Sequence, residues 1–354
     1  MGKPPMKQIY VTGHGGPEKL QVREAADPNP GPGELRVRVK ACGVNFADIL
    51  ARRGLYPDAP RPPMVVGYEI SGSVDQIGSA VDEQWLGRDV FALVRFGGYA
   101  DTVTVAASQV FFKPSALDHA HSVALPVQYL TAWQLLVVMG AVKAGDSILI
   151  HNAGGGVGLA AIDIARRFGA TIYGTASPGK HAFLRERGLD HAIDYTRGDW
   201  REELMQLTSG AGVDLIIDPL GGAHWKKSYS ALRSTGRLGI FGISSATTSH
   251  LPGSLRLLAL AAATPWFHPL SLMSRNRGVF GVNLGHLWNE LPTLQAWMRS
   301  LLEGVDAGWI RPHVDRTFPF ERADEAHAWI EDRKNLGKVV LTVGETVSSA
   351  AEHT

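Results

Sequence analysis

A chain of 354 residues, 45% of them hydrophobic, is long enough for about two domains with ordinary cores. Its 35 Lys and Arg residues nearly balance 34 Asp and Glu residues, and the net charge of +1 argues against a nucleic-acid partner, which requires a basic excess. The single cysteine, Cys42, excludes an intrachain disulfide and suits a cytoplasmic location. Neither a signal peptide nor an apolar run of about 18 residues is present, so we expect no transmembrane span.

The first hundred or so residues indicate a β-rich domain. Residues 35–40 alternate apolar and basic side chains, which is typical of a half-exposed strand. Further short strands are expected at 70–77, 90–94 and 99–105, between turns that contain glycine. This pattern favours a compact barrel or sandwich.

Strand and helix patterns alternate from about Ser122 onward. Strands are expected at 147–151, 171–175, 191–194, 213–218 and 237–241. Such alternation predicts an α/β fold, a doubly wound parallel sheet with helices on both faces. We assign this Rossmann domain to residues 122–311. The last strand, 337–343, is assigned to the first domain, which then comprises residues 1–121 and 312–354.

The strongest local motif is the glycine-rich turn after the strand that begins at Ser147. Ala153, Gly155 and Gly158 form an Ala-x-Gly-x-x-Gly sequence between an apolar strand and a helical pattern. Glycines let backbone N–H groups approach a pyrophosphate, and the helix N-terminus favours its negative charge. The sequence therefore predicts a dinucleotide site, although a tight turn without a ligand is the simpler alternative.

The next strand indicates which dinucleotide is bound. An NAD site carries Asp or Glu at the end of this strand, where the chain has Thr175, Ala176 and Ser177, followed by Lys180. A hydroxyl and a lysine would accept a 2′-phosphate, so we predict NADPH rather than NADH. The alternative for Lys180 is an ordinary solvated lysine.

Residues 251–277 form an apolar insertion. A pair of short helices packed on the Rossmann domain is the simplest interpretation. A hydrophobic substrate lid and an interfacial, peripheral membrane contact are the alternatives. A strand is expected at 279–284, followed by a helix at 287–302.

Several sequence strings resemble one protein family. They lie at 13–18, 42–48, 53–57, 152–158 and 334–338, and they are similar to the zinc-free quinone oxidoreductase branch of the medium-chain dehydrogenase/reductase superfamily. The string at 283–287 resembles the synaptic vesicle VAT-1 homologue group within that branch. The resemblance implies that the β-rich domain has the GroES-like fold, and that the protein is a homodimer in which strand 279–284 extends the sheet between subunits.

Zinc-dependent members of the superfamily would need a cysteine in place of Asn45, a histidine in place of Tyr68 and four further cysteines. Thiolate and imidazole are the usual zinc ligands, so we predict no metal site. Without a Lewis acid the enzyme must polarise its substrate through hydrogen bonds. This favours electron-poor hydride acceptors, namely quinones and α,β-unsaturated carbonyl compounds.

The resemblance also implies residue roles. Asn45 would donate to the substrate oxygen or position the nicotinamide ribose, and Tyr56 would donate its hydroxyl, with Tyr68 and Thr131 as polar lining. Simple packing of Tyr56 and helix capping by Asn45 are the alternatives. The expected cofactor contacts are Gly155, Gly156, Val157 and Gly158 at the pyrophosphate; Ser177, Lys180 and Tyr195 at the adenosine phosphate; and Phe241, Ile243, Asn283 and Asn335 near the nicotinamide.

Three functions remain open at this point. The first is an NADPH-dependent, zinc-independent oxidoreductase that reduces a quinone or an α,β-unsaturated carbonyl compound. The second is an NADPH-binding protein with little or no turnover that acts as a scaffold, a sensor or a membrane-associated factor. The first is the prediction, and the apolar insertion 251–277 and the VAT-1 likeness keep the second open. The third is a structural, crystallin-like use of the fold, which the residues neither indicate nor exclude.

Overall fold

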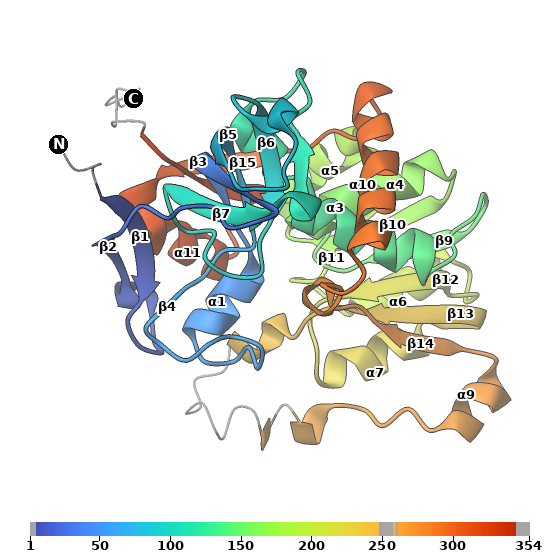
Figure 1. Cartoon of the computed structure of the whole chain (residues 1–354). Helices are drawn as coiled ribbons and strands as arrows, with labels where there is room; N and C mark the ends of the chain where they lie inside the picture. The colour runs from blue at the N-terminus through green and yellow to red at the C-terminus, as the bar shows by residue number, and fades with distance from the viewer. Residues whose placement is uncertain (1–4, 248–257, 260, 345–354) are drawn as a thin grey trace, which may run out of the picture. The chain divides into compact units, whose positions relative to one another are not determined.

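The computed structural model describes residues 5–247, 258–259 and 261–344 (Figure 1). The chain forms two compact units. One consists of residues 1–127 and 314–354, and the other of residues 128–313.

The first unit is rich in β-structure, as the alternating patterns predict. Its larger sheet has the order β15-β16-β3-β5-β6-β8, with β7 also paired to β3, and its smaller sheet has the order β2-β1-β4. The strands are β1 (Met6–Val11), β2 (Leu20–Ala25), β3 (Glu34–Val44), β4 (Met64–Val65), β5 (Glu69–Ile77), β6 (Asp89–Leu93), β7 (Thr102–Ala106), β8 (Val110–Phe112), β15 (Val314–Pro319) and β16 (Lys338–Thr342). The helices are α1 (Phe46–Arg52), α2 (His119–Ser122) and α11 (Ala323–Glu331).

The C-terminal strand β16 completes the larger sheet of this unit. It pairs antiparallel to β3, with Val339 opposite Val44 and Val340 opposite Gly43. β5 lies on the other side of β3, with Ile70 opposite Cys42. The start of β16, the end of β3 and the start of β5 are therefore neighbours.

The second unit is a parallel six-stranded sheet in the order β11-β10-β9-β12-β13-β14. Numbered within the unit, this order is 3-2-1-4-5-6, the doubly wound arrangement of dinucleotide-binding domains. Its strands are β9 (Ser147–Ile150), β10 (Thr171–Ala176), β11 (His191–Asp194), β12 (Val213–Asp218), β13 (Leu232–Ile240) and β14 (Gly278–Gly281). The predicted fold class, a Rossmann sheet with a GroES-like β-rich domain, is confirmed.

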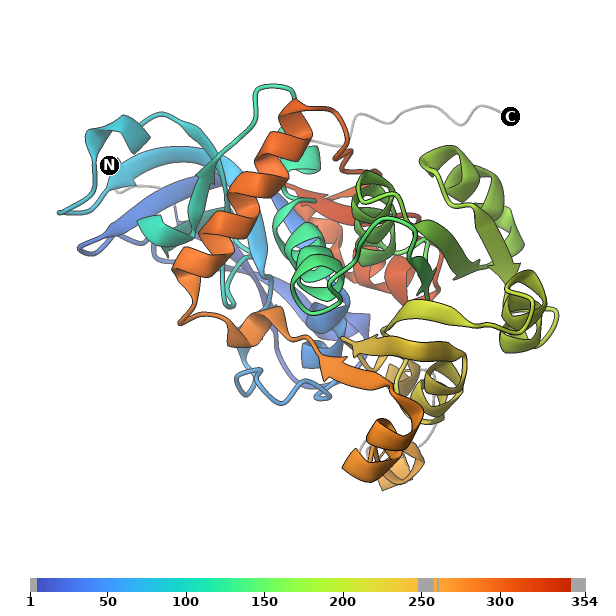
Figure 2. The same ribbon diagram turned by 90° about the vertical axis from the view of Figure 1, so that its right-hand side faces the viewer.

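Helices cover both faces of this parallel sheet (Figure 2). They are α3 (Pro126–Trp133), which continues as a π-helical turn over Gln134–Val138, α4 (Gly156–Arg167), α5 (His181–Arg187), α6 (Trp200–Leu207), α7 (Ala223–Ser230) and α10 (Leu291–Asp306). A further helix, α9 (Pro269–Arg275), has no buried residue. Because both faces are covered, the central strand β9 is apolar throughout its buried part, and Ile148, Leu149 and Ile150 are fully buried.

Several element boundaries differ from the expected ones: β13 begins at Leu232 rather than 237, β7 begins at Thr102 rather than 99, and both elements after the insertion are shifted. The strand expected at 279–284 ends at Gly281, and Leu284–His286 forms a 3-10 turn capped by the Asn283 side chain, whose Oδ1 accepts from the Gly285 N–H at 3.0 Å. The following helix begins at Leu291 rather than 287, with a proline in its first turn. Asn and Pro side chains favour such helix starts, and apolar periodicity alone does not reveal them.

The described part of the insertion does not pack as expected. Residues 248–257 and 260 lie outside the described residues. In the remainder, Trp266 is 88% exposed, Leu270 66% and Met273 70%, whereas Phe267 packs against the core with its ring 5.3 Å from that of Tyr229. The prediction of helices packed on the domain is therefore wrong for this segment, because the apolar face of α9 is exposed. Among the described residues, no helix combines the length and apolar character required to cross a membrane.

Candidate active site

The glycine turn connects the carboxyl end of β9 to the N-terminus of α4. Asn152 adopts the left-handed conformation with φ of 54°, which Asn tolerates better than most residues. The Gly155 N–H then donates to the Asn152 carbonyl at 2.9 Å, and Gly155 caps α4. The first N–H groups of a helix have no intrahelical acceptor, so those of Gly156, Val157 and Gly158 remain available for an anion.

The glycines of the turn are required by their neighbours. A Cβ on Gly156 would lie 1.8 Å from Nε2 of Gln128, and one on Gly158 would lie 2.5 Å from the carbonyl oxygens of Asn152 and Ala153. A side chain at position 158 would therefore meet backbone atoms, whereas one at position 156 would have to displace the side chain of Gln128. A backbone cradle of this kind fits a dinucleotide pyrophosphate. Gln128, which is buried and lies over Gly156, was not identified from the sequence, because nothing in its local pattern connects it to the turn.

The residues expected around the adenosine phosphate follow two adjacent strands. Ala176 of β10 pairs with Asp194 of β11, so Ser177 and Tyr195 follow paired positions at one edge of the sheet. Ser177 and Lys180 are half-buried at the two ends of a short 3-10 turn, and Tyr195 is 40% exposed. Hydroxyl and ammonium groups thus gather at the strand ends, where the doubly wound fold binds its ligands.

The other expected cofactor residues are more widely distributed. Phe241 and Ile243 are half-buried just beyond β13, and Asn283 is exposed, with its side chain used as a cap. Thr131, which was expected to line the substrate site, is buried on α3. Asn335 belongs to the other unit, where its Nδ2 donates to the Gly337 carbonyl at 3.1 Å.

Asn45 lies in the β-rich unit, at the junction of β3 and α1. It occupies the N-cap position of α1, but the carboxylate of Asp48 satisfies the Asn45 N–H at 2.8 Å and the Gly67 N–H at 2.9 Å. The Asn45 amide is used differently. Its Nδ2 donates to Oε1 of Glu69 at 2.8 Å, and its Oδ1 accepts from Nζ of Lys338 at 2.8 Å. Asn45 and Asp48 also form the capping box of α1, so helix capping accounts for only part of the contacts of the Asn45 side chain.

An aromatic group lies in the same unit. The rings of Tyr56 and Tyr68 meet edge to face at 6.2 Å, and the ring of Phe96 lies 5.2 Å from that of Tyr68. Burial raises the pKa of Tyr68, so its phenol keeps its proton and can donate it in a hydrogen bond. Tyr56 and Phe96 are half-buried, so both rings retain accessible surface. Phe96 was not identified from the sequence.

The thiol of the only cysteine is buried and unreactive. Cys42 is fully buried in the core of the β-rich unit, and burial raises the pKa of its thiol to about 12. The thiolate that zinc or a nucleophilic mechanism would require is therefore disfavoured.

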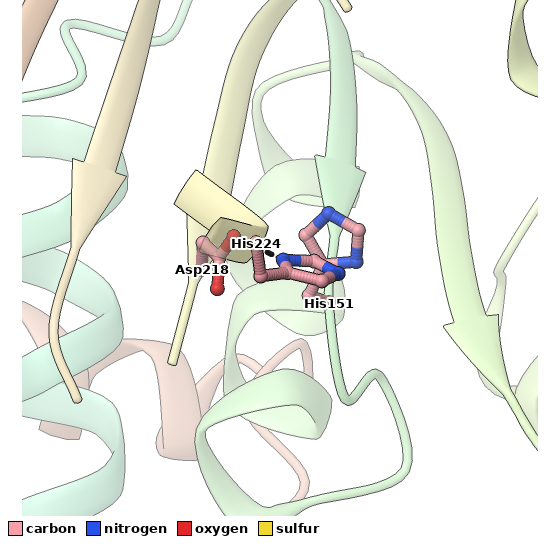
Figure 3. A group of neighbouring side chains, drawn as sticks. All are labelled: His151, Asp218 and His224. Atoms are coloured by element: carbon pink, nitrogen blue, oxygen red, sulfur yellow. Dashed lines mark hydrogen bonds and ion pairs between the residues drawn. The ribbon is translucent and has the colours of Figure 1, made fainter. Parts of the chain in front are cut away.

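A polar cluster of His151, Asp218 and His224 lies at the carboxyl ends of parallel strands of the second unit (Figure 3). His151 follows β9, Asp218 ends β12, and His224 lies on α7, with one potential ligand atom of each within 4.8 Å of the others. Nδ1 of His224 lies 2.6 Å from Oδ2 of Asp218, and the Ser228 hydroxyl donates to the same oxygen at 2.6 Å. Nε2 of His151 lies 3.2 Å from Oγ of Ser228.

Hydrogen bonds thus already engage the atoms that a metal would need. Nδ1 of His151 also lies 3.0 Å from Oγ1 of Thr175 on β10. Burial lowers the pKa of His151 to about 3, so the imidazole is neutral and can accept from one hydroxyl while donating to the other. The cluster connects β9, β10, β12 and α7 at the edge that carries the glycine turn. No local pattern in the sequence predicts this cluster, since its members come from separate elements.

A doubly wound sheet with a glycine turn, together with a β-rich unit of this topology, defines the class of GroES-like and Rossmann oxidoreductases. The alcohol dehydrogenase GroES-like domain family matches residues 31–115, and the zinc-binding dehydrogenase family matches residues 187–341. The human synaptic vesicle membrane protein VAT-1 homolog is 39% identical over 346 residues, covering 96% of this chain and 87% of the relative.

Solved structures agree with this assignment. The human VAT-1 homolog-like protein has a TM-score of 0.85 at 29% identity, covering 98% of this chain and 100% of that one. The Escherichia coli quinone oxidoreductase complexed with NADPH has a TM-score of 0.84 at 28% identity, with coverages of 95% and 99%. The chain therefore belongs to the medium-chain dehydrogenase/reductase superfamily, in its zinc-free, quinone oxidoreductase-like branch.

Proposed function

We propose that this oxidoreductase reduces a small hydrophobic quinone or α,β-unsaturated carbonyl compound with NADPH. The observation that carries the proposal is the Asn45 amide, which is held in the β-rich unit as a hydrogen-bond donor, with a group of tyrosines in the same unit. Support for the cofactor comes from the glycine cradle over Gly156 and Gly158 and from the NADPH complex of the Escherichia coli quinone oxidoreductase.

In this proposal each residue has a defined task. Bound NADPH supplies the hydride. The side-chain amide of Asn45 donates an N–H to the substrate oxygen and stabilises the negative charge that develops there when the acceptor is reduced. Tyr56 supplies a second hydroxyl donor, and the rings of Tyr68 and Phe96 provide apolar surface for a planar acceptor. The backbone N–H groups of residues 156–158 hold the pyrophosphate.

The direct test is NADPH oxidation at a panel of ortho-quinones, para-quinones and enones. We expect turnover that falls about 100-fold in Asn45→Ala, the usual effect of removing one donor to a developing oxyanion, with NADPH affinity little changed. NADPH binding without oxidation of any acceptor would contradict the reductase function, and failure to bind either nucleotide would contradict both candidate functions.

Substitution of Lys180 tests whether the protein prefers NADPH to NADH. If its ammonium contacts the 2′-phosphate, Lys180→Glu should raise the Kd for NADPH roughly 10- to 100-fold, which is the effect of losing a hydrogen bond to a charged group. The Kd for NADH should stay within about twofold, because NADH lacks that phosphate. The matched control is Lys226→Glu, which changes an exposed lysine on α7. Equal weakening of both nucleotides by Lys180→Glu would contradict the assignment. Fluorescence titration measures all four constants.

We also propose a cytoplasmic homodimer. β14 pairs with β13 on one side, and its other edge pairs with no strand in the described parts of the chain. An unpaired edge strand is a template for pairing with a second copy. Sedimentation at several protein concentrations measures the oligomeric state.

The exposed apolar face around α9 favours a second candidate, a weakly catalytic NADPH-binding protein that contacts membranes. Trp266, Leu270 and Met273 are each at least 66% exposed, and a surface of this kind fits an interfacial contact. If vesicle association is unchanged when residues 251–277 are deleted, this segment does not make the membrane contact.

A further inference from the structure

The carboxylate of Glu69 and the ammonium of Lys338 form an ion pair with no exposure to solvent. Burying two charges costs free energy unless close geometry and additional hydrogen bonds offset it. Both conditions are met here, because Glu69 Oε2 also accepts from the Val127 N–H at 2.8 Å and Lys338 also donates to Asn45. Gly43 leaves the space for the pair, since a Cβ there would lie 2.5 Å from Glu69 Oε1 and 2.7 Å from Lys338 Cε.

The pair closes a ring with the amide of Asn45. Nζ of Lys338 donates to Oε1 of Glu69 and to Oδ1 of Asn45, and Nδ2 of Asn45 donates to the same Glu69 oxygen. Rotating the amide by 180° would place its carbonyl against the carboxylate and its NH2 against the ammonium. Both contacts would be repulsive, so the ion pair fixes which end of the amide is the donor.

The ring has two consequences for Asn45. One Nδ2–H is committed to Glu69, and the second has no partner within the described residues; Asn45 is 9% exposed. The ammonium on Oδ1 also draws electron density from the amide, which strengthens the remaining N–H as a donor. A buried ion pair that needed only to be neutralised would not have to engage both ends of a neighbouring amide.

We propose that Glu69 and Lys338 are positioning residues that orient and polarise the Asn45 amide, so that it presents an N–H to the substrate oxygen. This inference rests on the proposed function, in which Asn45 is that donor. Glu69 and Lys338 act only through Asn45, and their effect on turnover depends on the presence of its amide.

The test is a comparison of variants with and without Asn45. The double substitution Glu69→Gln with Lys338→Met removes both charges, keeps similar volumes and leaves no lone buried ion. We expect kcat to fall about tenfold, the effect of misaligning one hydrogen bond, with the Kd for NADPH within about twofold. In the Asn45→Ala background the same double substitution should change kcat by less than about twofold, because coupled residues are not additive.

A second ion pair provides the control. Arg52 and Glu331 pair at 2.7 Å with side-chain exposures of 0% and 12%, and neither contacts Asn45 in the described structure. Arg52→Met with Glu331→Gln should lower the melting temperature but keep kcat. A tenfold loss that persists in Asn45→Ala would overturn the positioning role, and so would an unchanged kcat in the Glu69 and Lys338 double variant. If Asn45→Ala itself keeps full kcat, the proposed role of Asn45 fails instead.

A measurement on the unmodified protein covers the case in which the double variant does not fold. The side-chain amide signals of Asn45, identified by their loss in Asn45→Ala, should include one proton, the one donated to Glu69, that exchanges with water much more slowly than an exposed amide proton. Exchange of both protons as fast as in an exposed asparagine would mean that the amide is not held by Glu69, and the positioning role would be wrong.

Discussion

Substitution of Gly158 by alanine should abolish useful NADPH binding, with a Kd at least about 100-fold higher. The new Cβ would lie 2.5 Å from the carbonyl oxygens of Asn152 and Ala153. Both are backbone atoms, so the turn itself must move and the N–H groups at the start of α4 lose their alignment. Loss of two hydrogen bonds to a charged phosphate, at about 1.5–3 kcal/mol each, corresponds to this change in affinity.

Gly179→Ala is the matched control for this experiment. Gly179 lies in the 3-10 turn between Ser177 and Lys180, and a Cβ there would meet no atom within 4 Å. We expect unchanged NADPH binding in this variant. Fluorescence titration of both proteins, with circular dichroism to verify the fold, makes the comparison. Wild-type affinity in Gly158→Ala would contradict the assignment of this turn to the pyrophosphate.

The parts of the site that follow one another in sequence could be predicted from it. Ser147–Ile150, the glycine turn and α4 are contiguous, and their apolar spacing changes from that of a buried strand to that of a helix. Ser177 and Tyr195 follow strands recognisable by the same rule. Parallel strands end at one edge, so the sequence also predicts that these residues share it.

The parts that depend on tertiary pairing could not be predicted. Lys338 is 293 residues from Asn45 and 269 residues from Glu69, and the three meet only because β16 and β5 flank β3. A lysine at the start of a strand usually lies in solvent, and nothing local marks this one as buried. His151 was likewise outside the prediction, because its partners Ser228 and Asp218 come from separate elements.

For the apolar insertion 251–277 the sequence predicts a buried face that the structure shows to be exposed. Leu270 and Met273 predict a buried face by composition, yet both are exposed on α9. Hydrophobic periodicity indicates that a face is covered in the functional state, and it does not identify the covering surface. A partner or a membrane is therefore as consistent with the pattern as the domain's own core.

His151 should make the protein less stable as the pH falls. Burial lowers the pKa of its imidazole to about 3, whereas in the unfolded chain the pKa is about 6.5. Between these values the unfolded chain binds a proton that the folded protein does not, so acidification favours unfolding. Because of this one group, the free energy of unfolding falls by at most about 1.4 kcal/mol for each pH unit below pH 6.5. At and above neutral pH this group causes no loss of stability.

The measurement is the free energy of unfolding in urea at pH 7.0, 6.0, 5.0 and 4.5. We expect His151→Gln to be less stable than wild type at pH 7.0, because the hydrogen bonds to Thr175 and Ser228 are disturbed, and to lose less stability than wild type on acidification. His268→Gln is the control, since His268 is exposed, and we expect the same slope as in wild type. The same slope in His151→Gln as in wild type would show that this imidazole binds a proton in the folded protein. The hydrogen-bonded cluster of Figure 3 would then have to accommodate a positive charge beside Asp218, which already accepts from Ser228 and lies 2.6 Å from Nδ1 of His224.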